Sequence, residues 1–280
     1  MTRTLLSLGH GFSSVALAAR LVPQGWRVIG TTRSAEKMDA IRGTGVEPVL
    51  WPGTDLEPLL DAADHLLVSA APGEGGDPFL AAAGAEIAAA RFDWVGYLST
   101  VGVYGDHAGG WVDEDTPTTP STARGQARVD AEAAWCALGL PVHVFRLAGI
   151  YGPGRGPFAK VRAGTARRIV KPGQVFSRIH VDDIAAVLEA SINAPAPGTI
   201  YNVCDNEAAP PQDVIAYAAE LLGVPVPPAI PIEEAEMTPM ARSFYAESKR
   251  VRNDRITETL GVQLRHPTYR EGLRALLDSE

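Results

Sequence analysis

The sequence TLLSLGHGFSS at residues 4–14 joins an apolar run to a glycine-rich turn, Gly9-His10-Gly11-Phe12-Ser13-Ser14. The next residues, up to Pro23, are amphipathic enough for a helix, and a second strand-like run starts at Trp26. A strand, a G-x-G turn, a helix and a second strand are the opening βαβ unit of a nucleotide-binding fold. A signal peptide agrees less well with these residues, because Gly9, His10 and Gly11 interrupt the apolar run.

Each small residue of this turn has a physical reason in such a fold. Gly9 permits the tight turn, and Gly11, lacking a Cβ, lets a pyrophosphate approach the backbone N–H groups at the helix start. The third position usually carries Gly or Ala, so Ser14 is a small departure. A tight turn that binds no ligand is the alternative interpretation.

The end of the second strand, Thr32-Arg33-Ser34, favours NADP over NAD as the cofactor. An NAD site usually places a carboxylate there for the ribose 2′-hydroxyl, but none occurs before Glu36. Arg33 suits a 2′-phosphate, and Thr32, Ser34 and Lys37 add donors. Alternatively, Arg33 and Lys37 belong to a solvated helix start, and a neighbouring loop supplies the carboxylate.

Strand-like and helix-like segments alternate as far as residue 147, which predicts an α/β fold with a doubly wound parallel sheet. We expect a nucleotide-binding domain over residues 1–150, to which residues 179–203 return, and a small substrate lobe over 151–280. Ligands bind at the carboxyl ends of parallel strands. The loops expected there add Ala70, Ala71 and Ala148 to the cofactor contacts.

Composition limits the function of this 280-residue chain. Its net charge of −8 argues against general nucleic-acid binding, and no apolar run is long enough for a membrane span. The two cysteines, Cys136 and Cys204, have no metal-ligand spacing and suit a reducing cytoplasm. We therefore expect a cytoplasmic protein without a metal ion.

Five segments in order resemble the extended short-chain dehydrogenase/reductase superfamily, the NAD(P)-dependent epimerases and dehydratases, and most of all its atypical branch. They are LGHGFSS (8–14), LSTVGVYG (98–105), FRLAGIYGPGR (145–155), RIHVDDIA (178–185) and YNVCD (201–205). The resemblance covers nearly the whole chain. It implies a Rossmann-like fold, a nicotinamide cofactor and a homodimer through a helix pair that includes residues 121–138.

The resemblance also implies a catalytic Ser or Thr, a Tyr acting as acid and base, and a Lys four residues after that Tyr. Thr100 matches the hydroxyl, but Arg124 and Arg128 stand at the Tyr and Lys positions. Arg128 keeps a positive charge for the cofactor ribose. Arg124 cannot exchange a proton at working pH, but it can bind a carboxylate or phosphate of the substrate.

Proton transfer then needs another group, for which Tyr104, Tyr151 and His180 are the candidates. Packing is the alternative for both tyrosines, and fixing a lobe boundary is the alternative for His180. Asp182 or Asp183 is expected to cap the following helix.

A charge pattern suggests an anionic substrate. Residues 133–181 contain no Asp or Glu but eight Lys and Arg residues, so the rest of the chain carries −16. Such a cationic wall attracts a small anion. The expected substrate contacts are Arg124, Tyr151, Arg155, Arg178 and His180. The alternatives are a solvated basic surface and a contact to an acidic partner subunit.

These features predict an NAD(P)-dependent oxidoreductase or epimerase-like enzyme with Arg at the usual Tyr and Lys positions. The missing Tyr leaves a second hypothesis open, a non-catalytic NADP-binding redox sensor or regulatory module.

Overall fold

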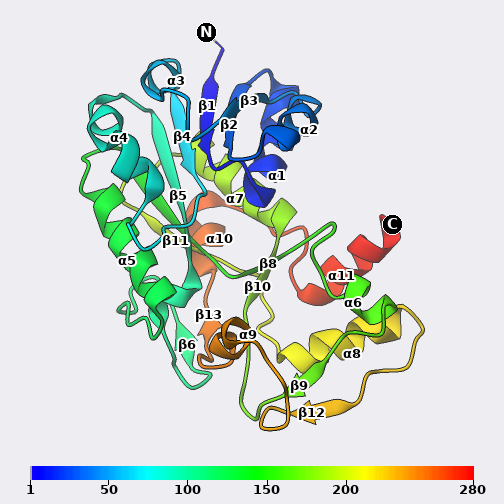
Figure 1. Ribbon diagram of the computed structural model, residues 1–280. Helices are drawn as coiled ribbons and strands as arrows, with labels where there is room; N and C mark the ends of the chain where they lie inside the picture. Colours follow the sequence, from blue (N-terminus) through cyan, green and yellow to red (C-terminus); the bar gives the residue numbers. More distant parts are fainter. Residues whose placement is uncertain (1) are drawn as a thin grey trace.

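A parallel sheet of seven strands forms the centre of the molecule in the computed structural model, which describes residues 2–280 (Figure 1). Its order, β11-β7-β5-β4-β1-β2-β3, reverses direction at β1, as expected for a doubly wound sheet. The strands are β1 (Thr4–Leu8), β2 (Arg27–Thr32), β3 (Glu47–Leu50), β4 (His65–Val68), β5 (Trp94–Thr100), β7 (Val142–Leu147) and β11 (Ile200–Val203).

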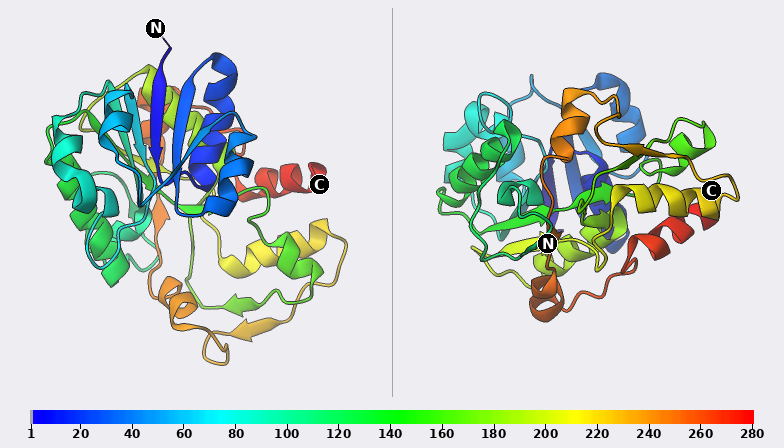
Figure 2. Two further views of the ribbon diagram at one scale, coloured as in Figure 1. Left: turned by 45° about the horizontal axis from the view of Figure 1, so that its top comes forward. Right: turned by 90° about the horizontal axis from the view of Figure 1, so that it is seen from below.

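Helices cover both faces of this sheet. One face carries α1 (Phe12–Leu21) and α7 (Val181–Asn193), whose apolar sides share one buried cluster with the sheet. The other carries α3 (Glu57–Asp61), α4 (Pro78–Ala89) and α5 (Ala123–Cys136). The two further views in Figure 2 show the same layers. The short α2 (Met38–Arg42) follows β2. The predicted α/β class is confirmed.

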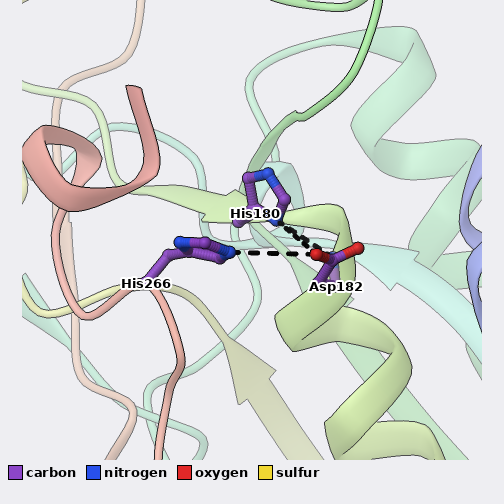
Figure 3. A group of neighbouring side chains, drawn as sticks. All are labelled: His180, Asp182 and His266. Carbon is purple, nitrogen blue, oxygen red and sulfur yellow. Dashed lines mark hydrogen bonds and ion pairs between the residues drawn. The ribbon is translucent and has the colours of Figure 1, made fainter. Parts of the chain in front are cut away.

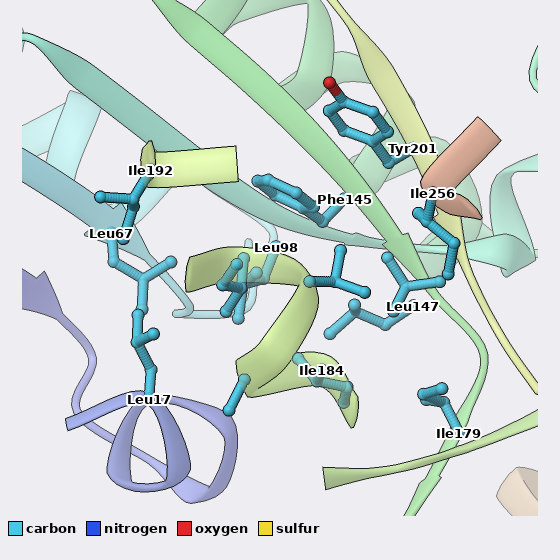
Figure 4. Close-up of a cluster of buried hydrophobic side chains, with 14 of the residues drawn as sticks. Leu17, Leu67, Leu98, Phe145, Leu147, Ile179, Ile184, Ile192, Tyr201 and Ile256 are labelled. Carbon is cyan, nitrogen blue, oxygen red and sulfur yellow. The ribbon is translucent and has the colours of Figure 1, made fainter. Parts of the chain in front are cut away.

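The central strands are apolar on both faces because helices bury both. In β1, Leu5 belongs to the cluster under α1 and α7, whereas Leu6 belongs to the cluster under α3, α4 and α5. Figure 4 shows the first cluster, with Leu67, Leu98 and Phe145 reaching from neighbouring strands toward Leu17 and Ile192. Side chains alternate between faces along a strand, so each strand supplies both cores.

A smaller body lies beyond the carboxyl edge of the sheet (Figure 1). It has its own buried cluster, which includes Tyr151, Phe158, Ala218, Tyr269 and Leu273. We call this body the lobe. Its elements are β8 (Gly149–Tyr151), α6 (Phe158–Arg162), β9 (Arg168–Val170), β10 (Arg178–His180), α8 (Pro211–Leu221), β12 (Ala229–Pro231), α9 (Pro239–Phe244) and α11 (Tyr269–Asp278).

The chain between α9 and α11 is helical only in its second half. Residues 250–251 form β13 (Arg250–Val251), which pairs in parallel with β6 (Trp111–Val112), and only α10 (Asp254–Leu260) is helical. Ile256 of α10 enters the core under α7. Tertiary packing here outweighs the helical propensity of the segment.

Among residues 2–280, no helix combines the length and hydropathy that crossing a bilayer requires.

Candidate active site

The turn after β1 is held in shape by neighbouring strands. Gly9 has a φ of +81°, and a Cβ on it would lie 2.9 Å from the backbone nitrogen of Ala70. Its N–H donates a 2.7 Å hydrogen bond to Oγ1 of Thr31 at the end of β2. Only glycine can adopt this positive φ and fit this close to Ala70 without strain. Thr31, which is not among the predicted site residues, fixes the turn from outside it.

Gly11 opens the turn to a ligand. It precedes α1 in an extended conformation, with no side chain capping the helix, and a Cβ on it would meet only the Gly9 oxygen, at 3.8 Å. The first N–H groups of α1 therefore stand beside open space and can bind an anion together with the helix dipole. This geometry fits the pyrophosphate of a dinucleotide.

Ser14 compensates for the missing third glycine. Its hydroxyl donates a 3.0 Å hydrogen bond to Oγ of Ser69, and Ser69 in turn donates to the Gly9 carbonyl. Ser13 and Ser14 are buried against the sheet, whereas Phe12 is half-buried. The serine at this position thus ties α1 to the end of β4.

His10 takes part in packing rather than facing a ligand with its side chain. The imidazole occupies the space over Gly30, where a Cβ would come within 2.6 Å of it. Its Nδ1 lies 3.3 Å from Ser7 Oγ, and burial lowers the pKa of His10 to about 4. The side chain is therefore neutral near pH 7, and only its backbone belongs to the turn.

The end of β2 presents the predicted cationic groups to solvent. Arg33 and Lys37 are exposed, and neither side chain has a hydrogen-bond or ion-pair partner within residues 2–280. Ser34 donates its N–H to Thr32 Oγ1 at 3.3 Å, which closes a small turn next to Arg33. An unpaired guanidinium beside two hydroxyls suits a 2′-phosphate.

Arg128 lies at the carboxyl edge of the sheet, as expected. Its Nη1 donates to the carbonyl of Leu98 at 2.7 Å, to the hydroxyl of Tyr97 at 3.1 Å and to the carbonyl of Ala70 at 3.5 Å. Burial raises the pKa of Tyr97 to about 12, so this hydroxyl stays protonated. Arg128 thus holds together the ends of β4 and β5.

Thr100 and the first turn of α5 are neighbours. Thr100 ends β5 half-buried, and its Oγ1 accepts the N–H of Gly102 at 3.2 Å. A Cβ on Gly125 would lie 3.1 Å from the Gly102 oxygen, so α5 begins directly against this turn. Arg124 is exposed there, and its guanidinium packs 4.9 Å from the ring centre of Phe244 in α9. Phe244 was not foreseen.

The buried position of Tyr104 contradicts its prediction as a catalytic residue. It has no solvent exposure, and its hydroxyl donates to Asn202 Oδ1 at 2.7 Å and accepts from Arg146 Nη1 at 3.0 Å. Arg146 also forms a buried ion pair with Glu132, at 2.8 Å. The hydroxyl is fully engaged inside the core and has no access to a substrate.

Tyr151 and His180 are also packing residues. The Tyr151 hydroxyl lies over Gly272, where a Cβ would come within 2.0 Å, and burial raises its pKa far above the usual range. His180 is 2% exposed and meets the Tyr151 ring edge-on at 5.2 Å. His180 itself caps α7, since its Nδ1 accepts the N–H of Asp182 at 3.2 Å. The expected Asp182 or Asp183 cap is therefore wrong.

The basic segment 133–181 is only partly available to a ligand. Arg146 and Arg162 pair with carboxylates from outside the segment, Glu132 and Glu280. Arg178 donates to the carbonyls of Phe176 at 2.9 Å and Ala209 at 3.0 Å. Arg155 lies 5.6 Å from the ring centre of Phe12, beside the glycine-rich turn.

Ala148, an expected cofactor contact, is buried between β7 and β8, and its N–H donates to the Val203 carbonyl.

Comparison with known proteins places this site in a family. No family model matches the chain. Protein YeeZ of Escherichia coli is 32% identical over 235 residues, which cover 79% of this chain and 84% of YeeZ. A structure from Methylobacillus flagellatus, described as an NAD-dependent epimerase/dehydratase, is 27% identical with a TM-score of 0.71, covering 99% and 98% of the two chains. The chain belongs to the NAD-dependent epimerase/dehydratase family.

Three further proteins extend this comparison. A conserved protein of unknown function from Silicibacter pomeroyi is 64% identical, with a TM-score of 0.95 over 100% of both chains. The 3-diazoavenalumate denitrifying reductase of a Streptomyces species is 30% identical over 58% of this chain and 55% of that reductase. A human epimerase family protein, solved with NADPH, shares the fold at 20% identity and a TM-score of 0.75, covering 100% of both chains.

Proposed function

We propose that this protein is an NADP-dependent oxidoreductase or epimerase-like enzyme that acts on a small anionic molecule. The observation that carries the proposal is the position of Arg124 next to the turn that follows Thr100. Its guanidinium is exposed and pairs with no carboxylate among residues 2–280. Arg124 stands at the position that the catalytic Tyr occupies in the family that the sequence resembles. A cation there recognises a substrate where a Tyr would exchange a proton.

The residues of the glycine-rich turn fit the cofactor. Gly11 and the first turn of α1 would hold the pyrophosphate, and Arg33 would bind the 2′-phosphate that distinguishes NADP from NAD. Arg128 keeps the ends of β4 and β5, over which the nicotinamide half would lie, in one arrangement. Bound NADPH supplies a hydride; the chain supplies the positions of both reactants.

Arg124 and Thr100 would act on the substrate together. Arg124 binds its carboxylate or phosphate, and the Thr100 hydroxyl donates a hydrogen bond to the oxygen that gains charge. Fixed positive and hydrogen-bonding groups stabilise such charge without giving up a proton. Because Tyr104, Tyr151 and His180 are packed inside, the proton comes from water or from the substrate itself. The similarity to a named reductase favours hydride transfer over epimerisation.

The test compares anionic substrates with neutral analogues. NADPH oxidation is followed with a panel of oxo-acids, phosphorylated ketones and 3-diazoavenalumate, each paired with its methyl ester or dephosphorylated form where one exists. We expect turnover only with anions, and a loss of at least about tenfold in kcat/KM for Arg124→Ala. Turnover of anions that is unchanged in Arg124→Ala overturns the substrate assignment.

A non-catalytic NADP sensor is the second candidate, favoured by the internal engagement of Tyr104, Tyr151 and His180. It predicts a difference in affinity between NADP⁺ and NADPH, with no hydride transfer to any member of the panel. Turnover of a single substrate that depends on Thr100 excludes it.

A further inference from the structure

Three potential metal ligands from separate parts of the chain meet at the start of α7 (Figure 3). His180 ends β10, Asp182 lies in the first turn of α7, and His266 precedes α11. Oδ2 of Asp182 lies 3.7 Å from Nδ1 of His180 and 3.8 Å from Nε2 of His266. The three atoms all lie within 4.8 Å of one another.

Hydrogen bonds among the three side chains do not explain this arrangement. A separation of 3.7–3.8 Å is too long for a hydrogen bond between nitrogen and oxygen. Nε2 of His266 is buried and has no hydrogen-bond partner among residues 2–280, which is costly for a polar atom. The imidazoles are 3% and 5% exposed, whereas Asp182 is 42% exposed. The cluster is therefore enclosed on its histidine side and open to solvent on its carboxylate side.

Surrounding contacts hold the two histidines in place. The carboxylate of Asp183 accepts the backbone N–H of Arg265 at 2.7 Å and of His266 at 3.1 Å, which fastens this segment to α7. The ring of Tyr151 packs against His180, and the two imidazole centres are 4.0 Å apart. Such support orients ligands before an ion binds.

We propose that His180, Asp182 and His266 bind a divalent transition-metal ion of the zinc class. Bonds of about 2.0–2.2 Å at tetrahedral angles separate ligand atoms by roughly 3.4 Å. Oδ2 of Asp182 must therefore approach each imidazole nitrogen by only a few tenths of an ångström, and the two nitrogens, which lie within 4.8 Å of each other, must also draw together. Two imidazoles and one carboxylate favour zinc, cobalt or nickel over magnesium or calcium. Water from the open side completes the coordination.

Two existing contacts would change when the ion binds. Nδ1 of His180 exchanges the N–H of Asp182 for the metal, and water from the side of the partly exposed Asp182 carboxylate replaces the cap on this partly buried N–H. Arg265, 3.8 Å from Asp182 and 77% exposed, turns into solvent. The ion then joins the segment before α11 to α7, and so fastens the lobe to the central sheet. This role goes beyond hydride transfer.

Metal binding is measured on the full chain after chelation and dialysis, by calorimetry with ZnCl₂ and by the absorption spectrum of bound Co²⁺. We expect one ion per chain, a tetrahedral Co²⁺ spectrum, a higher Tm with Zn²⁺ and no such change with Mg²⁺. Asp182→Asn and His266→Gln should each weaken binding at least about tenfold. Cys136→Ser is the matched control, because Cys136 is an exposed thiol that could bind zinc adventitiously.

Two ligand variants test the metal site, so the experiment still decides if His266→Gln folds poorly. Asp182 is partly exposed and has no polar side-chain contact shorter than 3.7 Å with the described residues 2–280, so Asp182→Asn should fold like the parent chain. Binding that persists in Asp182→Asn, or that is lost only in Cys136→Ser, overturns the site. So does the absence of a one-to-one complex with Zn²⁺.

Discussion

The guanidinium of Arg128 donates a 2.7 Å hydrogen bond to the carbonyl oxygen of Leu98. The same nitrogen reaches the Tyr97 hydroxyl and the Ala70 carbonyl, so a helix side chain fixes the ends of two adjacent strands. The family resemblance implies a Lys at this position. The Arg that replaces it carries the same charge and also donates hydrogen bonds to backbone carbonyls.

Replacing Arg128 by Lys should preserve the charge and lose this bracing. A lysine ammonium on its shorter stem cannot reach all three acceptors, and a typical hydrogen bond contributes about 0.5–1.5 kcal/mol. We expect a lower Tm and NADPH binding weaker by roughly tenfold, measured by thermal unfolding and fluorescence titration. Arg124→Lys is the control, since Arg124 is exposed on the same helix. Equal effects of the two substitutions would contradict the bracing role.

Gly9 and Gly11 should respond differently to alanine. Gly9→Ala forces a side chain into a φ of +81° and against Ala70, at a cost of about 1–3 kcal/mol, so the protein itself is destabilised. Gly11→Ala meets open space and should fold normally, but its methyl group occupies the expected pyrophosphate position. We expect a near-normal Tm with NADPH affinity reduced at least about tenfold. Retained NADPH affinity in Gly11→Ala would move the cofactor elsewhere.

Arg33→Ala should remove the preference for NADP that we propose for this protein. A hydrogen bond between charged groups contributes about 1.5–3 kcal/mol, which corresponds to a roughly 10–100-fold weaker NADPH complex. The affinity for NADH should hardly change. Arg91→Ala, an exposed arginine just before β5 at the opposite edge of the sheet, is the matched control. An unchanged ratio of NADPH to NADH affinity in Arg33→Ala would refute the cofactor assignment.

Glu132→Gln should strongly destabilise the fold. Glu132 accepts from both Ser99 and Arg146 in the core, and its removal leaves the Arg146 charge buried without compensation. Breaking a buried pair costs about 3–5 kcal/mol, which lowers Tm on the order of 10 °C. The double variant Glu132→Gln/Arg146→Met should recover part of this loss in thermal unfolding. A double variant less stable than Glu132→Gln would argue against an uncompensated charge as the cause.

Asp205→Asn should stabilise the protein at high pH more than at low pH. Burial raises the pKa of Asp205 to about 8, from an ordinary value of 3.8. Between these two values the folded chain retains a proton that the unfolded chain releases, so this contribution to stability falls as pH rises toward 8. Asparagine does not titrate. The Tm of the variant relative to wild type should therefore rise between pH 5 and pH 8.

Asp278→Asn is the control, because Asp278 is exposed in α11. The difference in Tm between Asp278→Asn and wild type should stay nearly constant between pH 5 and pH 8. A constant difference for Asp205→Asn as well would mean that Asp205 is ionised in the folded chain at pH 5.

The sequence predicts most elements of the sheet because buried parallel strands alternate with amphipathic helices in a regular order. It misses β13, since two residues pairing with β6 leave no periodic pattern. At the turn, the glycines are recognisable from their spacing, but Thr31 is not, because its bond to Gly9 depends on how strands pair.

Site residues outside the turn were harder to predict, because their surroundings depend on contacts between distant segments of the chain. Tyr104, Tyr151 and His180 carry suitable chemistry, yet burial, which depends on packing from distant segments, removes them from the ligand. His266 is 86 residues from His180 in the chain, and nothing in the local sequence connects them. The Arg124 and Arg128 positions, by contrast, follow from the family resemblance, and their spacing of four residues places both on one face of a helix.

The lobe's core is drawn from three separate stretches of the chain, residues 151–166, 209–219 and 269–276. Between them the chain returns to the central sheet twice, through α7 with β11 and through β13 with α10. A new substrate preference therefore cannot be grafted onto this protein as one contiguous insert. A chimera must exchange all three stretches together, or its lobe will join surfaces that never evolved to fit each other.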